Sequence, residues 1–343
     1  MATTFKTLTA NDIANTRTLL HEAIPLTGTI ASGTYTDQNI KTYSHGMFES
    51  TYDYPYLSSS ANHIFDLSMG YSTGSALSAS AGTGVQQSKK VNIYNQMAQV
   101  LVGHNAEGSI QRFDQDGNLA DGGTKLDEVV FVNFARLLSK DEIKKGTFSI
   151  AFLTGGTPAA RTDLLSIGDH GAATSYLVNS PAGEYGVLYT SSAAPNSNSG
   201  VGLVYYQAGV AVLTGSVFAG TDMGPGISSG SFDSLATGSN IDVMAQSVRN
   251  RLSNVSFNNT IELNSTIYFC RANHNEFNYS ANPTYLSSSQ IRVKNTTSDN
   301  PVSYITTVGL YSSDNELLAV AKLSEPLKKD PNTELTLRVR LDY

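Results

Sequence analysis

The sequence predicts a mainly β protein with a few short helices (α+β), in which a β-rich N-terminal and central domain with extended arms precedes an antiparallel β-sandwich. Strand-like alternation of apolar and polar residues recurs along the chain, whereas helical spacing is confined to short segments. Only 15% of the residues are charged, and Ser, Thr, Asn and Gly are abundant. This composition favours surfaces that contact other proteins, because hydroxyl and amide groups cost less to desolvate than ions.

The length of 343 residues indicates about two domains, since a domain typically has roughly 100 to 200 residues. We place the first at 1–230 and the second at 231–343, because the Gly/Ser-rich stretch 224–230 has the composition of a hinge. The second domain is expected to begin with a linker helix and to continue as the sandwich.

Four segments have helical spacing or a helix-capping pattern. Their expected ranges are 10–24, 88–102 and 139–145 in the first domain and 240–252 in the second. Thr9 and Asp12 form a capping-box pattern before the first of them. Gly103 favours a left-handed end to the second, because glycine adopts positive φ without strain.

Most other periodic segments are typical of strands. The clearest lies at the C-terminus, where every second residue from Leu335 to Leu341 is apolar. Further strands are expected in the second domain at 260–271, 289–294, 303–311 and 317–323, and in the first domain at 129–135, 147–154, 186–190, 201–206 and 210–214. Asp314-Asn315 and Pro331-Asn332 are turn signals between the last of them.

Two segments have too little aliphatic content to form a core of their own. The stretches 28–44 and 68–83 are rich in Gly, Ser, Thr and Tyr, so we expect extended arms or surface loops there. The stretch 191–200 is nearly all small and polar, and we expect a loop.

Charge and cysteine content exclude several classes of partner. The formal net charge is −7 and the pI about 5.3, which opposes binding to nucleic acid. No apolar stretch reaches the roughly 18 residues of a membrane helix, so no membrane insertion is expected. The single cysteine, Cys270, forms no intramolecular disulfide, and the N-terminus lacks a signal-peptide pattern. We therefore expect synthesis in a reducing cytosol.

The motifs that carry chemistry are weak, and we predict no catalytic, cofactor-binding or metal site. The stretch 226–230 matches G-x-S-x-G, but it lacks the strand and helix that expose such a serine. Asp114, Asp116 and Asp121 lie in a segment similar to a calcium loop. That loop requires glycine at its sixth position and an acid at its twelfth, where this chain has Leu119 and Lys125, so a turn is expected.

Other polar groups have simpler structural explanations. The six histidines are scattered, and no two have the spacing of metal ligands on one helix face. Asp169 and His170 lie in a Gly-flanked stretch, which indicates a surface loop rather than an acid–base pair. Asp127 and Glu128 are neighbours on one strand and point to opposite faces, unlike the paired acids of glycosidases.

An aromatic stripe is the clearest candidate for recognition. Tyr52, Tyr54 and Tyr56 alternate with Asp53 and Pro55. Tyrosine offers a large contact area with one polar tip, so the stripe suits packing on a partner subunit or stacking on a host-surface glycan.

Several stretches resemble a family of virion structural proteins of marine contractile-tailed phages, of the cyanophage and pelagiphage type. They are IYNQMAQVLVG at 93–103, FDQDG at 113–117, FNYSANPTY at 277–285, and YITTVGLY at 304–311 through LDY at 341–343. A shorter likeness, VGLY at 308–311 followed by ELLAVAK at 316–322, is similar to tail-collar and tail-fibre attachment domains.

The resemblance implies a non-enzymatic structural subunit of a tailed-phage virion, in the tail or baseplate, assembled in the host cytoplasm. Its expected partners are copies of itself and neighbouring virion proteins, with no cofactor. Three alternatives remain open: a receptor- or glycan-binding tail-fibre or adaptor protein, a capsid decoration protein, and a hydrolase of surface polysaccharide.

Overall fold

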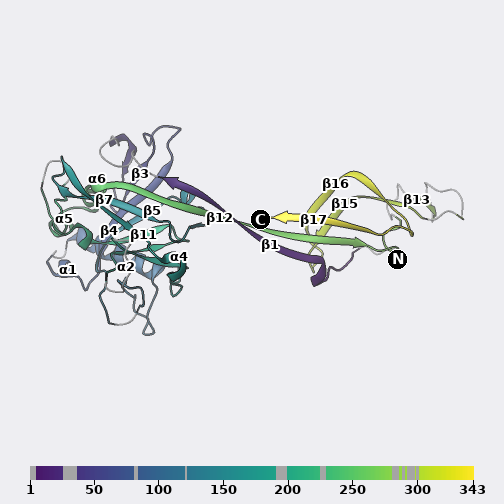
Figure 1. The fold of residues 1–343 in the computed structure, drawn as a ribbon, viewed down its shortest axis with the longest axis horizontal. Coiled ribbons are helices and arrows are strands. Elements are labelled where there is room, and N and C mark those ends of the chain that lie inside the picture. Colours follow the sequence, from purple (N-terminus) through teal and green to yellow (C-terminus); the bar gives the residue numbers. More distant parts are fainter. Residues whose placement is uncertain are drawn as a thin grey trace. The chain divides into compact units, whose positions relative to one another are not determined.

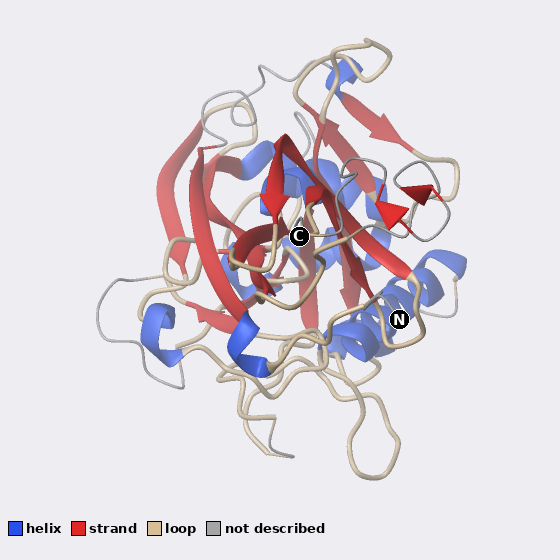
Figure 2. Ribbon diagram, turned by 90° about the vertical axis from the view of Figure 1, so that its right-hand side faces the viewer, coloured by secondary structure: helices blue, strands red, loops and turns tan. Residues whose placement is uncertain are grey.

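The computed structural model describes residues 5–25, 37–80, 84–119, 122–190, 199–224, 229–279, 286–287, 290–291, 298 and 301–343. Strands predominate over helices in these residues, which confirms the mainly β class (Figure 2). The chain divides into a larger unit, Leu20–Ile261, and a smaller unit, Met1–Leu19 with Glu262–Tyr343. Residues 231–261, which the sequence assigned to the second domain, therefore fold with the larger unit.

The larger unit is built on a seven-stranded antiparallel sheet (Figure 1). In spatial order its strands are β2 (Ile40–Thr42), β3 (Glu49–Tyr52), β4 (His63–Tyr71), β5 (Glu128–Phe134), β11 (Val210–Thr214), β10 (Gly202–Tyr205) and β9 (Tyr185–Leu188). Side chains alternate between its two faces: Val130 and Val132 enter one apolar core, whereas Val129 and Phe131 enter the other. Because both faces are covered, the central strands are apolar at nearly every position.

A second sheet covers one face of the first. It contains β12 (Leu252–Ala272), β7 (Ser149–Gly156) and β8 (Arg161–Gly168), with β1 (Ile13–Pro25) and β6 (Glu142–Ile143) beside β12. Phe134 of the first sheet contacts Phe148 and Phe257, with ring centroids 5.8 and 5.2 Å apart. The larger unit is therefore a sandwich of two sheets around an aromatic core.

Helices close the remaining sides of this sandwich. They are α1 (Ala76–Ser80), α2 (Val85–Leu101), α3 (Arg136–Ser139), α4 (Ala172–Ser175), α5 (Phe232–Gly238) and α6 (Ile241–Arg251), with the 3-10 turns η2 (Asp37–Asn39) and η3 (Gly215–Phe218). A further 3-10 turn, η1 (Ala10–Asp12), belongs to the smaller unit. α2 packs on β4 and buries Tyr94 and Leu101. The predicted helices at 88–102 and 240–252 are confirmed as α2 and α6, and Gly103 has the expected positive φ of 94°.

In its described residues, the smaller unit is made mainly of strands and buries few apolar side chains. β17 (Leu335–Asp342) pairs with β12, and β15 (Ser303–Tyr311) pairs with β16 (Leu317–Lys329) as a separate two-stranded ribbon. The short strands β13 (Leu286–Ser287) and β14 (Gln290–Ile291) form a further pair. Among the described residues of this unit, the only buried apolar side chains are Ala272, Val302 and Val339. The strands predicted at 303–311, 317–323 and the C-terminus are confirmed.

Two predicted helices are wrong. The capping box of Thr9 and Asp12 does form, but it closes only the turn η1, and the chain then continues as β1 along β12. Pairing with another strand overrides a local helical pattern here. The helix predicted at 139–145 is also absent, because α3 ends at Ser139 and Lys140 has a φ of 55°. The chain then enters β6, where Ile143 is fully buried.

The predicted arm at 68–83 is wrong where the structure describes it. Ser68–Tyr71 complete the buried strand β4, and Tyr71 and Ser72 are at most 2% exposed. Residues 81–83 lie outside the described residues. Of the arm predicted at 28–44, residues 28–36 lie outside the described part, and residues 40–42 form the edge strand β2.

Candidate interaction surface

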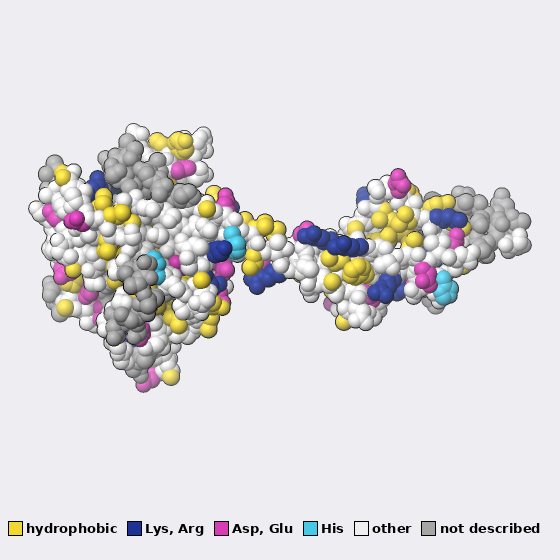
Figure 3. All heavy atoms as spheres, in the orientation of Figure 1, with side chains coloured by type: hydrophobic (Ala, Val, Ile, Leu, Met, Phe, Trp, Pro, Cys, Tyr) yellow, Lys and Arg dark blue, Asp and Glu magenta, His cyan; other side chains and the backbone are white. Residues whose placement is uncertain are grey.

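The two-stranded ribbon of the smaller unit carries several exposed apolar side chains. Leu318 and Val320 of β16 are 69% and 51% exposed, and Tyr311 of β15 is 46% exposed. The ring of Phe5, itself half exposed, lies edge-on to Tyr311 with centroids 4.9 Å apart. Figure 3 shows yellow apolar side chains gathered on the surface of this unit. We call Phe5, Tyr311, Leu317, Leu318 and Val320 the ribbon patch.

The ribbon is apolar on both faces. Val308 pairs with Ala321 and Leu310 pairs with Ala319, and these four side chains are partly buried. The other face carries Val320 opposite Gly309. A strand that is apolar on both faces is typical of one that is covered on both sides.

A tight turn fixes the geometry of this ribbon. The hydroxyl of Ser312 accepts the backbone N–H groups of Asp314 and Glu316, and Asn315 has a φ of 63°. Asparagine tolerates this left-handed conformation better than most residues. The predicted Asp314-Asn315 turn is therefore confirmed, and it places the apolar run of β16 directly after the turn.

The predicted aromatic stripe is only partly at the surface. Tyr52 is half-buried and lies against Tyr56 and His63, whereas Tyr54 is 58% exposed. The carboxylate of Asp53 accepts the backbone N–H of Asn62 at 2.6 Å, which ties the two ends of the loop together. Tyr54 and the neighbouring Leu57, which is 87% exposed, therefore lie at the surface of a loop whose ends are fixed by this hydrogen bond.

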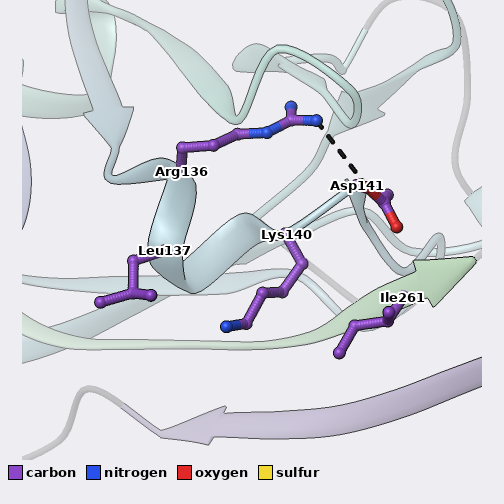
Figure 4. Close-up of a pocket in the computed structure, with 5 residues that line it drawn as sticks. All are labelled: Arg136, Leu137, Lys140, Asp141 and Ile261. Carbon is purple, nitrogen blue, oxygen red and sulfur yellow. Dashed lines mark ion pairs between the residues drawn. The ribbon is translucent and has the colours of Figure 1, made fainter. Parts of the chain in front are cut away.

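A shallow hollow on the larger unit is lined by Arg136, Leu137, Lys140, Asp141 and Ile261 (Figure 4). Arg136 points toward Asp141, with 4.0 Å between guanidinium nitrogen and carboxylate oxygen. Its lining combines two cationic side chains and one carboxylate with the apolar side chains of Leu137 and Ile261.

Asp169 is a structural carboxylate. Its oxygens accept the backbone N–H groups of Gly146 and Phe148 and the hydroxyl of Tyr206, at 2.7, 3.0 and 2.9 Å. Burial raises the pKa of Asp169 to about 6, although these three hydrogen bonds oppose the shift. The side chain joins the loop before β7 to the end of β10, so the predicted surface loop is wrong for Asp169, which is 2% exposed.

This raised pKa predicts a pH-dependent difference between the wild type and Asp169→Asn. A folded pKa above the unfolded value contributes stability that is present below about pH 4 and is lost as the pH rises through about 6. Asparagine does not titrate. The wild type should therefore lose about 2 to 3 kcal/mol relative to Asp169→Asn between pH 4 and pH 7. Urea denaturation at each pH checks this, and a pH-independent difference would contradict it.

The remaining candidate motifs are occupied by structural contacts. Asp114 is buried, and its carboxylate forms an ion pair with the ammonium of Lys125 at 2.6 Å. The carboxylate of Asp116 accepts a hydrogen bond from the side-chain amide of Asn118 at 2.7 Å. Asp121, the third acid of that segment, lies outside the described residues. In the part of the chain that the structure describes, no group of three or more His, Cys, Asp or Glu side chains is placed to hold a metal ion.

The other two acids considered at the sequence level are also engaged. Asp127 accepts the hydroxyl of Ser72 and pairs with Arg112, and Glu128 accepts the hydroxyl of Ser75. Both carboxylates thus hold the turn after β4. Of the 226–230 motif, residues 226–228 lie outside the described residues, as do residues 191–198 of the predicted loop.

Sequence reasoning identified the tyrosine loop but not the ribbon patch as a recognition surface. The signal was present: β16 begins with five consecutive apolar residues, 317–321, between Glu316 and Lys322. Alternation of apolar and polar residues identifies strands that have one buried face. A strand that is apolar on both faces is instead interpreted as a fully buried core strand.

Comparison with known proteins gives no match: no family model fits the chain, and no curated protein and no solved structure is significantly similar to it. Within the described residues, no helix combines the length and the apolar character that crossing a membrane requires.

Proposed function

We propose that this chain is a non-enzymatic structural subunit of a tailed-phage virion, in the tail or baseplate, which assembles with copies of itself and with neighbouring virion proteins. The observation that carries the proposal is the exposure of the ribbon patch in a unit whose described residues bury few apolar side chains. Exposed apolar clusters of this kind mark protein–protein contact sites.

Three further observations support the proposal. The candidate motifs for chemistry that the structure describes are engaged in structural contacts. The surface is weakly charged, which lowers the desolvation cost of large interfaces. The stretches at 93–103, 113–117 and 304–343 resemble virion structural proteins of marine contractile-tailed phages.

The particle itself provides the test of this proposal. We expect antibody against the chain to label the tail or baseplate of intact particles, and a particle reconstruction to contain the chain in symmetric copies. Labelling of head lattices would favour a capsid decoration protein instead. Absence of the chain from purified particles would contradict the proposal.

A second candidate, a receptor- or glycan-binding adaptor, is favoured by the loop that holds Tyr54. Its aromatic ring is exposed on a loop closed by Asp53 and Asn62, and tyrosine rings stack on sugars. Binding of the purified chain to a glycan array, lost in Tyr54→Ala, would support this role.

A further inference from the structure

Aromatic side chains gather at the edge of the seven-stranded sheet that β2, β3 and β4 form. Five of the 21 residues from Tyr43 to His63 are Tyr or Phe, whereas aromatic residues make up 9% of the whole chain. None of these five residues belongs to either apolar core of the larger unit. The packing of the sandwich therefore does not explain their concentration at this edge.

One face of the sheet is open at this edge. Cross-strand pairing places four polar side chains in one row on that face, namely Lys41, Ser50, Asp66 and Asn133. Phe131 lies two positions before Asn133 on the same face of β5 and is buried in the second apolar core, whereas Asn133 is exposed. The layer that covers this face therefore ends before the row.

Polar groups from this face meet in one cluster with aromatic side chains. The Oδ1 atom of Asp66 accepts the hydroxyl of Ser50 at 2.5 Å and lies 2.8 Å from Nε2 of His63. The hydroxyl of Tyr43 lies 3.3 Å from that of Ser50. The ring of Tyr52 lies against that of His63, with centroids 5.5 Å apart. Burial and the neighbouring Tyr43 and Asp66 raise the pKa of Tyr52, so its hydroxyl stays protonated.

The cluster leaves an acceptor and an aromatic ring accessible. Both donors reach Oδ1 of Asp66, and within the described residues no donor reaches its Oδ2. The side chain of Asp66 is 23% exposed. The ring of Tyr56, which is 36% exposed, lies beside Tyr52 with centroids 6.3 Å apart. We call Tyr43, Ser50, Tyr52, Tyr56, His63 and Asp66 the tyrosine face.

We propose that the tyrosine face binds a neutral sugar ring of a glycan. The exposed ring of Tyr56 stacks on the C–H face of the sugar, and Oδ2 of Asp66 accepts a sugar hydroxyl. The inference deepens the glycan-binding role given above as the second candidate function, and it rests on that role. Tyr54 alone carried that role, whereas the tyrosine face adds a carboxylate acceptor and a second exposed ring.

The chemistry of the face favours a sugar over other ligands that stack on tyrosine. Nucleotides also stack on aromatic rings, but the carboxylate of Asp66 and the net charge of −7 repel their phosphates. The cation of the row, Lys41, lies over the ring of Tyr43 at 4.9 Å. A sugar ring combines an apolar C–H face with hydroxyl donors at its rim, which matches an exposed aromatic ring beside a carboxylate.

Hydrogen bonds hold the tyrosine face in place before a ligand binds. The backbone N–H of Tyr56 donates to the carbonyl of Gln38 at 2.9 Å. The side-chain amide of Asn39 donates to the carbonyl of Tyr52 at 3.3 Å. Because the backbone of both tyrosines is already fixed, binding requires little further ordering of the chain.

Titration of neutral hexasaccharides into the full chain tests the acceptor. The probes are hexasaccharides of glucose, of mannose and of galactose, and binding is measured by isothermal titration calorimetry. We expect at least one of them to bind, and Asp66→Asn to weaken that binding about tenfold. Asparagine keeps the shape of the side chain, but with its oxygen facing Ser50 and His63 it places an N–H donor where the sugar requires an acceptor. Thermal melting checks that the variant is folded.

A second set of variants tests the ring. Tyr56→Ala removes the stacking surface and should weaken binding about tenfold, whereas Tyr56→Phe keeps the ring and should bind within about twofold of the wild type. Tyr304→Ala is the matched control, because this tyrosine of β15 in the smaller unit is 50% exposed and lies outside the tyrosine face. It should leave binding unchanged.

The outcomes separate this site from the roles proposed above. Binding that Tyr54→Ala removes, but that Asp66→Asn and Tyr56→Ala leave unchanged, would keep the glycan role and overturn the tyrosine face as its site. No binding of any hexasaccharide at millimolar concentration would overturn the site, and incorporation of the chain into particles would still support the structural role. Binding that responds as described, in a chain absent from particles, would keep the site and overturn the virion assignment.

Discussion

Replacing Arg251 with methionine should lower the free energy of unfolding by about 3 to 5 kcal/mol. The guanidinium is 1% exposed and donates only to backbone carbonyls: to Leu153, Gly155 and Gly156 at the end of β7, and to Asp222. Methionine fills much of the volume but leaves these carbonyl oxygens buried without a donor. Because folded domains are stable by only about 5 to 15 kcal/mol, the loss is a large fraction of the total.

Urea denaturation is the measurement, followed by tyrosine fluorescence, since the chain has 18 tyrosines and no tryptophan. Arg251→Lys should recover little, because a single ammonium group does not reproduce the planar fork of the guanidinium. Arg136→Met is the matched control: its side chain is 68% exposed, and the change should stay within about 0.5 kcal/mol. Equal stability of Arg251→Met and Arg136→Met would show that the carbonyl contacts contribute nothing.

Arg251 also shows where sequence reasoning reached its limit. The sequence analysis found α6 from its apolar spacing, but a charged residue at a helix end is most often a solvated one. The acceptors of Arg251 are carbonyl groups about 30 and 100 positions away in the chain, and every residue carries such a group. No side-chain pattern in the sequence marks them. The sequence likewise does not indicate that Glu49 is the partner of Arg249, although the carboxylate and the guanidinium lie 2.7 Å apart.

The strands that were predicted share one property. β5, β10, β11 and β17 have a periodicity or an apolar run that is visible within a few residues. β1 was misread because its partner β12 lies more than 200 positions away, and that pairing decides its conformation. β4 was misread in part because Gly70 and the serines around it are typical of a loop.

The candidate surface was predicted less completely than the fold. Tyr54 was identified as part of the aromatic stripe, because tyrosine offers a large contact area with one polar tip. The ribbon patch required the structure, since exposure of Leu318 depends on how many neighbours its sheet has. The sequence shows that a strand is apolar. Whether the strand is buried depends on whether another layer of the same chain packs on it, and this is visible only in the fold.

Substituting valine for Gly70 should destabilise the larger unit by several kcal/mol, and alanine by about 1 to 3 kcal/mol. A Cβ atom at this position in β4 would lie 2.7 Å from the carbonyl oxygen of Lys90 and 2.8 Å from the backbone nitrogen of Tyr94, both in α2. Backbone atoms of a helix cannot rotate away as a side-chain tip would. Glycine is therefore required here so that α2 can approach the sheet.

The helix is also held where it is, so it cannot shift to make room. The buried ammonium of Lys90 donates to the carbonyls of Ala236 and Ser239 at the end of α5, at 2.5 and 2.6 Å. The hydroxyl of Tyr94 donates to the carbonyl of Leu126 at 2.9 Å. Displacing α2 would stretch these hydrogen bonds and open the core beneath the helix. The steric clash of the new side chain at position 70 and the loss of these contacts would then both lower the free energy of unfolding.

Gly238→Ala is the matched control, because a Cβ at Gly238 in α5 meets no atom within 4 Å. That variant should be as stable as the wild type or slightly more stable, since alanine restricts the unfolded chain. Urea midpoints of the three variants should therefore fall in the order Gly238→Ala, Gly70→Ala, Gly70→Val, from most to least stable. A Gly70→Val variant with the wild-type midpoint would mean that α2 does not pack against β4 at this distance. Residues 68–71 would then again be candidates for the surface segment that their composition suggested.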